Sequence, residues 1–302
     1  MDNVELIFYR YKYRTEVSAS TGTEYQKLFE RIMVEKYGVD FVKVKPWGAE
    51  GDWKSDGFLQ STKTVYQVYA PNELKAVETV TKIQEDFNGA LKKWGIKMEC
   101  WTFVHNSTNG IPPPVLDKIL DIETANPNKG ISIMGPEELE KLLFGLNDSF
   151  MADLYGYMPT RNDLTGIGNQ DIKKVVDHIS RTENVDNQEM SPVSSRKLYV
   201  NNLGEEVRSL ITIGLTKSEA VNSYFSNHYD AKLGDQIAST FNRRYEQLKS
   251  LELSSDDIFV QLQEFISQGR SMSAKEQVAS LAVLTYLFER CDIFENEQNG
   301  MS

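Results

Sequence analysis

Short apolar segments that suit β-strands alternate with segments of helical periodicity between residues 41 and 144, and this alternation restricts the fold most strongly. The expected strands are 41–45, 57–59, 64–70, 101–104 and 131–134. The expected helices are 24–38, 73–94, a short segment ending at residue 120, and 136–146. Strands that alternate with helices predict an α/β domain, with residues 65–104 as a strand–helix–strand crossover.

The two ends of the chain follow other patterns. Residues 4–14 alternate apolar and basic side chains, which predicts a first strand or an irregular arm. Composition turns polar after about Pro159, and the pattern that follows is purely helical, with capping-box sequences at Thr216–Glu219 and Ser273–Glu276. The expected domains are therefore an α/β domain, a polar linker that contains a helix near 171–179, and an all-α domain, with bounds 1–158, 159–192 and 193–302.

Charge and cysteine content limit the functions that the chain can have. The net charge is −11, from 33 basic and 44 acidic residues. Because phosphate contacts dominate affinity for nucleic acids, such a chain needs a local basic patch, a metal ion or a partner to hold DNA. Two cysteines without metal-ligand spacing predict neither a disulfide scaffold nor a zinc site, and favour the cytoplasm. We expect no signal peptide and no membrane span.

Oxygen-bearing side chains gather around the second and third expected strands. Asp56 stands at the start of one strand, and Gln67 lies on the next, on the same face as Val65 and Tyr69. Asp52 lies in the glycine-containing loop just before them. Phosphodiester hydrolysis requires a hard divalent cation held by such oxygens, with a lysine to orient water. We therefore expect Asp56, Gln67 and Asp52 to bind Mg²⁺, or Mn²⁺.

The stretch from Gly51 to Gly57, with Gln67-Val68-Tyr69, resembles the Mrr-like branch of the PD-(D/E)xK nucleases. The resemblance covers roughly residues 20–105 and implies a restriction-endonuclease-like mixed sheet flanked by helices. It also implies contributions from the first helix, where Tyr25-Gln26 matches the family pattern and Glu30 shares a face with Gln26.

This chain departs from the family at Tyr69, where the family has lysine. Lys54 is the first candidate to replace that cation, and Lys45 is the second. Asp52, Asp56, Gln67 and Lys54 are therefore the expected catalytic residues. For Glu30 taken alone, a solvated position on the helix surface is favoured over catalysis.

A second resemblance lies in the C-terminal part. Residues 193–198 and 286–295 resemble the C-terminal domain of ABC-three-component proteins, and the nuclease-like stretch is similar to nuclease subunits of those systems, including the Lamassu group of anti-phage systems. The resemblance implies a DNA-cutting effector whose helical domain docks it to an SMC-like ABC ATPase and a small third subunit. Such an ATPase would supply the DNA contact that the acidic chain lacks.

The sequence therefore predicts an Mg²⁺-dependent deoxyribonuclease effector of an anti-phage complex, which forms a homo-oligomer when active because one metal site cuts one strand. Three alternatives stay open. In the first, the nuclease fold survives as an inactive adaptor, and Tyr69 marks the lost chemistry. In the second, the substrate is RNA or a nucleotide. In the third, Asp56-Gly57 is an ordinary turn dipeptide of a hairpin, and Gln67 is a satisfied polar residue in a sheet.

Overall fold

The structure is a computed structural model, which describes residues 1–46, 53–182, 201–290 and 293–294. The chain divides into two compact units. One unit comprises residues 13–154, and the other comprises residues 1–12 and 155–302. None of the helices in the described ranges combines the length and the apolar character that a membrane crossing requires.

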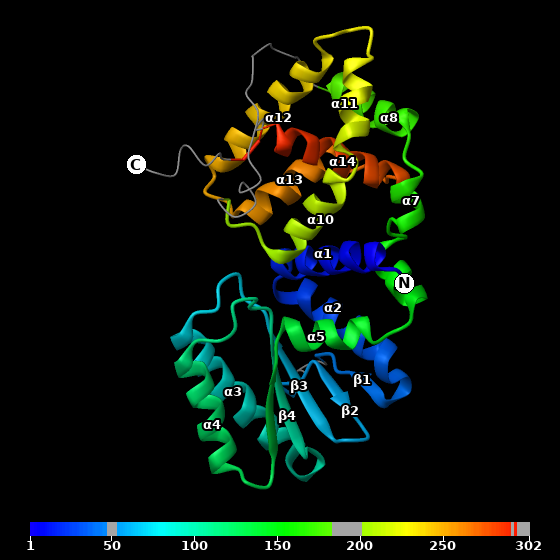
Figure 1. The fold of residues 1–302 in the computed structure, drawn as a ribbon. Coiled ribbons are helices and arrows are strands. Elements are labelled where there is room, and N and C mark those ends of the chain that lie inside the picture. Colours follow the sequence, from blue (N-terminus) through cyan, green and yellow to red (C-terminus); the bar gives the residue numbers. More distant parts are fainter. Residues whose placement is uncertain (47–52, 183–200, 291–292, 295–302) are drawn as a thin grey trace. The chain divides into compact units, whose positions relative to one another are not determined.

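The unit of residues 13–154 is a five-stranded mixed sheet between two layers of helices (Figure 1). Its strands are β1 (Phe41–Lys43), β2 (Gly57–Leu59), β3 (Thr64–Tyr69), β4 (Cys100–His105) and β5 (Gly130–Met134). Its helices are α2 (Gly22–Tyr37), α3 (Ala76–Trp94), α4 (Pro113–Ala125), α5 (Pro136–Phe144) and α6 (Asp148–Tyr155), the last ending at the boundary of the unit, together with the short 3₁₀ turns Gly38–Asp40 and Gly95–Lys97. The mixed sheet with flanking helices confirms the α/β architecture expected from the sequence.

The strands follow one another across the sheet in chain order, from β1 to β5. The first three pair antiparallel, and β3, β4 and β5 pair parallel. The parallel pairs require crossover connections, which α3 and α4 provide. Strand β3 is therefore the junction between an antiparallel hairpin and a parallel βαβαβ segment.

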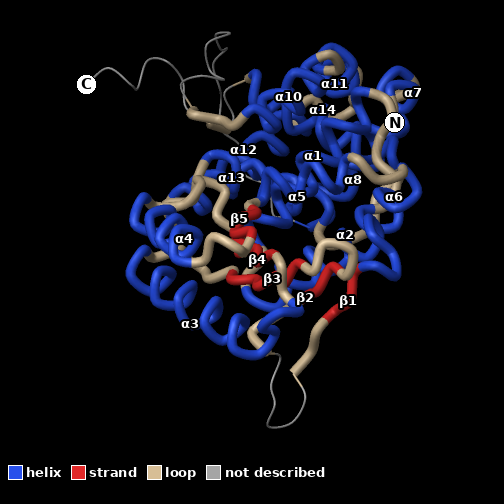
Figure 2. The backbone as a smooth tube through the Cα atoms, turned by 90° about the horizontal axis from the view of Figure 1, so that it is seen from below, coloured by secondary structure: helices blue, strands red, loops and turns tan. Residues whose placement is uncertain are grey.

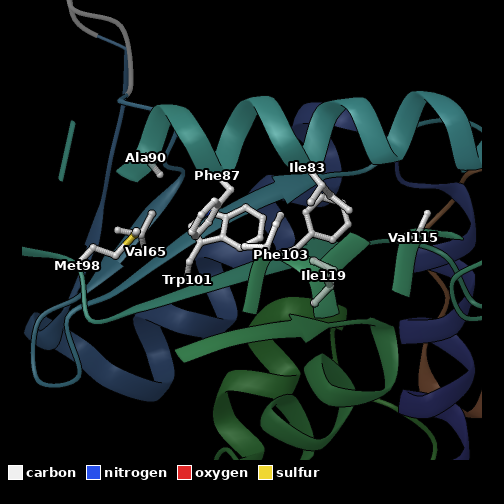
Figure 3. Close-up of a cluster of buried hydrophobic side chains, with 10 residues drawn as sticks. Val65, Ile83, Phe87, Ala90, Met98, Trp101, Phe103, Val115 and Ile119 are labelled. Atoms are coloured by element: carbon white, nitrogen blue, oxygen red, sulfur yellow. The ribbon is translucent and has the colours of Figure 1, made fainter. Parts of the chain in front are cut away.

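Helices α3 and α4 pack on one face of the sheet, around a core that includes Val65, Phe87, Trp101 and Phe103 (Figure 3). Helices α2 and α5 lie on the other face (Figure 2). On that face the rings of Phe29, Phe41 and Tyr66 contact one another with centroids 5.6 to 6.0 Å apart. Successive residues of β3 thus contribute to opposite cores, as the two-residue repeat of a strand requires.

Gly57 lies inside β2, paired with Tyr66 on one side and Lys43 on the other. A Cβ atom at this position would lie 2.3 Å from Cζ of Phe41, so only glycine leaves room for that ring. The turn of the β2–β3 hairpin is at residues 60–63 instead, where the sequence predicts it. The alternative that Asp56-Gly57 is a turn dipeptide is therefore wrong.

The helical unit is built around α14 (Ala274–Glu289), whose residues from Val278 to Phe288 are all buried. The surrounding helices are α7 (Arg161–Thr165), α8 (Asn169–Thr182), α10 (Glu205–Leu215), α11 (Ser218–Ser226), α12 (Leu233–Lys249) and α13 (Ser255–Ser267). Direct contacts with α14 are made by α7, α8, α10, α11 and α13. A helix that is apolar on all sides belongs in a core, and α14 meets that condition.

The structure draws the boundaries of the units differently from the ranges 1–158, 159–192 and 193–302. Helix α8 lies within the expected linker range, but it buries Ile172, Val175, Val176 and Ile179 against the helical unit. The helix expected near 171–179 is present as α8, and the described part of the range, up to residue 182, holds α7 and α8 with short loops. Residues 183–192 lie outside the described residues.

Residues 3–19 form a helix, α1 (Asn3–Ala19), and the expectation of a strand or irregular arm at residues 4–14 is wrong. Its tyrosines have partners in different units. The hydroxyl of Tyr9 donates to the Gly156 carbonyl at 3.1 Å, whereas that of Tyr13 donates to the Pro136 carbonyl at 2.6 Å. Because these side chains pack in two different units, the apolar residues of α1 do not form a single stripe. The sequence therefore shows an apolar–basic alternation that resembles the pattern of a strand.

Candidate functional site

Asp56 and Gln67 lie side by side on two neighbouring strands. Asp56 directly precedes β2, and its amide donates to the carbonyl of Tyr66 at 2.8 Å, next to Gln67 on β3. Because side chains alternate along a strand, Gln67 shares its face with Val65, whose side chain packs against α3. The two side chains that the sequence predicts as metal ligands therefore project together on the α3 face.

The contact between Asp56 and Gln67 is direct. Oδ2 of Asp56 accepts from Nε2 of Gln67 at 3.0 Å and from the backbone N–H of Val68 at 2.7 Å. Both side chains are buried, with 8% of Asp56 and 6% of Gln67 exposed. These two donors fix the carboxylate and turn the amide so that its nitrogen faces Asp56.

The amide oxygen of Gln67 has no hydrogen-bond partner among the described residues. A buried carbonyl oxygen without a donor is destabilising, because the lone pairs that it offered to water are left unsatisfied. Among the described residues, Gln67 is therefore satisfied through its nitrogen and not through its oxygen. The oxygen is available to a donor or a cation that enters beside Asp56.

This arrangement fits a hard cation. Mg²⁺ is commonly held by one or two carboxylates, with water and substrate phosphate completing its ligands, and it prefers oxygen throughout. Asp56 offers a fixed carboxylate, and Gln67 offers an unpartnered oxygen. The described residues contain no group of three or more His, Cys, Asp or Glu side chains that could hold a metal. The third expected ligand, Asp52, lies outside the described residues.

Lys54, the first candidate for the missing cation, is directed to α3. Its Nζ atom lies 3.0 Å from Oδ1 of Asp86, whose side chain is completely buried. Lys54 precedes Asp56 by two residues, and its ion pair places it on the sheet face that α3 covers. Lys54 thus lies against Asp86 and Gly89 on α3.

Lys45, the second candidate, pairs with Glu30 on α2 at 2.5 Å. Glu30 also accepts from Gln26 at 2.9 Å and lies 3.6 Å from Lys43. Only 3% of Glu30 is exposed, so the expectation of a solvated position on the helix surface is wrong. Helix α2 packs on the face opposite α3, where Glu30 has a charge network of its own.

Tyr69 occupies the position at which the resembled family has lysine. Its ring lies 6.2 Å from that of Phe103, and it is half-buried. Gln26, Val68 and Tyr69 line a surface hollow of about 270 Å³ where α2 begins and β3 ends. Gln26, which the resemblance implies as a site residue, therefore lies near the end of the strand that carries Gln67.

Sequence reasoning missed Asp86. The residue follows Ile83 by three positions and precedes Ala90 by four, so it falls within the apolar stripe that faces the sheet. An acidic residue in a buried stripe requires a cation, and Lys54 and Lys82 both contact it. The position of Asp86 in the stripe can be recognised from the sequence, but no sequence pattern indicates which cations lie near it.

Comparison with protein families matches residues 170–295 to C-terminal domain 10 of the ABC-three component (ABC-3C) systems. The matched segment covers α8 and α10 to α14, which lie in the helical unit. It confirms the resemblance of the C-terminal part, and it begins ahead of the expected start at residue 193. No curated protein and no solved structure matches the chain.

Proposed function

We propose that this chain, whose residues 170–295 match a C-terminal domain of ABC-three-component systems, is the metal-dependent DNA endonuclease of such a defence system. The observation that carries the proposal is the unpartnered, buried amide oxygen of Gln67 beside the fixed carboxylate of Asp56. The two groups lie on adjacent strands of a mixed sheet, in the order that the resemblance to PD-(D/E)xK nucleases implies.

Each residue of the candidate site has its own role in phosphodiester hydrolysis. Asp56 and Gln67 would hold Mg²⁺ or Mn²⁺, which when bound supplies charge relief at the phosphate and an acidified water. Lys54 orients the attacking water. The water oxygen forms a bond to phosphorus, the bond to the departing sugar oxygen breaks, that oxygen takes up a proton, and the water gives one up.

The acidic charge of the chain assigns DNA capture to its partners. With a net charge of −11, the free chain has a net repulsion for a phosphate backbone. We propose that an SMC-like ABC ATPase and a small third subunit present the DNA, and that two copies of this chain cooperate to cut both strands. Cleavage by the assembled complex should therefore exceed cleavage by the free chain.

Cleavage of supercoiled plasmid by the free chain and by the assembled complex, with Mg²⁺ or Mn²⁺, tests the proposal. Asp56→Asn should abolish cleavage and weaken Mg²⁺ binding measured by calorimetry. The matched control is Asp117→Asn, on the exposed side of α4, which should change neither. Parallel assays on single-stranded RNA and nucleotides identify the substrate class. Asp56→Asn that cuts like wild type would show the site assignment to be wrong.

A second candidate function is that of an inactive adaptor, which Tyr69 favours because it cannot supply the cation of the family motif. In that case the nuclease fold scaffolds the defence complex. It predicts no cleavage with any metal, no Mg²⁺ binding, and intact phage defence in cells that carry Asp56→Asn. The nuclease proposal predicts the opposite result in all three measurements.

A further inference from the structure

Two residues one turn apart on α3 hold the side chain of Lys54. Asp86 pairs with its Nζ atom at 3.0 Å, and the stem of the side chain lies against Gly89. We name Asp86 and Gly89 the Lys54 seat. Asp86 is completely buried although it carries a charge, which proteins tolerate only where a cation compensates it.

Gly89 is required by the close approach of Lys54. A Cβ atom at position 89 would lie 2.6 Å from Cγ and 3.4 Å from Cβ of Lys54, which is too close for the first contact. These atoms are near the backbone, so the lysine could not avoid the clash by moving only its tip. Glycine in the middle of a helix is unfavourable for helix stability, and here the space that Lys54 occupies accounts for it.

The backbone of the segment is strained to deliver the side chain. Trp53 and Lys54 both have φ of +56°, in the left-handed region that residues other than glycine rarely adopt. Contacts with α3 hold both residues: Nε1 of Trp94 donates to the Trp53 carbonyl at 3.2 Å, and Asp86 pairs with Lys54. Strain that the surroundings maintain is a frequent mark of functional positions.

The Lys54 seat and the Asp56–Gln67 pair lie on the same face of the sheet. A ring contact between β2 and α3 holds the strand and the helix next to each other. Phe58 stacks on Trp94 with ring centroids 4.8 Å apart, which ties the start of β2 to the end of α3. Asp86 lies eight residues earlier on α3, or about 12 Å along its axis. Asp56 lies two residues before Phe58, or about 7 Å along the strand.

Asp86 also contacts a lysine of its own helix. Nζ of Lys82 lies 2.6 Å from Oδ2 of Asp86, while Nζ of Lys54 lies 3.0 Å from Oδ1. Both oxygens of the buried carboxylate therefore face an ammonium group.

We propose that Asp86 and Gly89 are positioning residues, which hold Lys54 where it replaces the lysine that Tyr69 displaced from the family motif. The catalytic part of this inference rests on the proposed nuclease function, while the seat itself does not. The two parts therefore need separate measurements. Neither residue touches substrate, and both act through Lys54.

Lysine acetylation followed by mass spectrometry measures the seat without reference to activity. Lys54 should acetylate several-fold faster in Asp86→Asn and in Gly89→Ala than in the wild-type chain. Gly89→Ala is the safer variant for folding, because alanine favours the helix. The matched control is Glu99→Gln, which removes the carboxylate 2.5 Å from Lys63. It should expose Lys63 and leave Lys54 unchanged. Unchanged labelling of Lys54 in both seat variants would overturn the seat.

Plasmid cleavage by the complex, in a double-mutant cycle, tests positioning. Asp86→Asn and Gly89→Ala should each reduce cleavage by about 10²-fold, the effect of a small displacement of a positioned group, with Mg²⁺ binding unchanged. In a Lys54→Ala background neither should reduce it further. Additive losses would overturn positioning through Lys54. A wild-type complex that never cleaves would overturn the nuclease function and the catalytic part, while the labelling result still decides the seat.

Discussion

Nε2 of Gln67 donates to Oδ2 of Asp56 at 3.0 Å across the β2–β3 pair, while the amide oxygen of Gln67 has no partner among the described residues. The hydrogen bond uses the amide nitrogen of Gln67, which cannot bind a metal ion. The amide oxygen, which can bind a metal ion, stays buried without a partner. The arrangement therefore pairs a small loss of folding stability with a place for a cation.

Gln67→Glu should make the fold depend on divalent metal. Two buried carboxylates side by side repel each other, so without metal the free energy of unfolding should fall by about 1–3 kcal/mol. Added Mg²⁺ should restore much of that loss, because a cation between two carboxylates stabilises the folded state. Thermal unfolding with EDTA and with Mg²⁺ measures both effects. The control is Gln60→Glu, on the exposed hairpin turn, and its unfolding temperature should be the same with EDTA and with Mg²⁺.

Glu30→Gln should destabilise the unit of residues 13–154 more than Glu24→Gln does. Glu30 is buried and contacts Lys43 and Lys45, whereas Glu24 pairs with Lys27 in solvent. Because the lysines of Glu30 can turn to water, the expected loss is about 1–2 kcal/mol, below that of a fully buried pair. The exposed pair should contribute at most about 0.5 kcal/mol. Urea unfolding compares the two variants, and equal losses would contradict the burial of Glu30.

Gly57→Ala should destabilise the β1–β2–β3 sheet by about 1–3 kcal/mol, since the new methyl group would meet the ring of Phe41 at 2.3 Å. Phe41→Leu in the same chain should recover part of the loss by removing the clash. Gly168→Ala is the control, because no atom lies within 4 Å of the corresponding position. Thermal unfolding of wild type, Gly57→Ala, Phe41→Leu and the double variant gives the coupling between the two positions. A Gly57→Ala chain as stable as wild type would show that the ring moves away at little cost.

The helical unit should lose stability in acid through Glu276. The backbone N–H of Ser273, the largest favourable cause, and the Arg270 guanidinium lower the pKa of Glu276 to about 2 from the ordinary value of 4.5. A lowered pKa in the folded state stabilises the fold above pH 4.5, and that stabilisation disappears as the pH falls towards 2. Urea unfolding of wild type and Glu276→Gln across this range should show a difference that shrinks with acid. A constant difference would contradict the assignment.

The strands and most helices could be predicted because their signals are local. The segments at residues 57–59 and 64–70 alternate over a polar turn, and the structure pairs them as β2 and β3. Ser273 shows the same principle for a helix start, since its hydroxyl accepts from the Glu276 amide and Glu276 reaches back. Thr216 has the same sequence pattern, yet it ends α10, and α11 begins after Lys217 without a side-chain cap.

Only part of the candidate site could be predicted from the sequence, because some of its contacts join segments that are far apart in the chain. The contact between Asp56 and Gln67 follows from strand pairing, which periodicity predicts. The ion pair of Lys54 with Asp86 joins a loop to a helix 32 residues further along the chain, and no periodicity reports such a distance. The unpartnered oxygen of Gln67 also depends on how an amide turns, which only coordinates can show.

The position of the candidate metal pair in a hairpin bears on the order of folding. Asp56 and Gln67 are 11 residues apart, whereas β3 pairs with β4 across 36 residues, from Thr64 to Cys100. Short loops close at a smaller entropic cost, so we expect the hairpin to form before the parallel strands join it. Pulse-labelled hydrogen exchange should then protect the amide of Val68 no later than those of β4. During synthesis, the candidate metal ligands would thus come together before residues 170–295, which match a C-terminal domain of ABC-three-component systems, have left the ribosome.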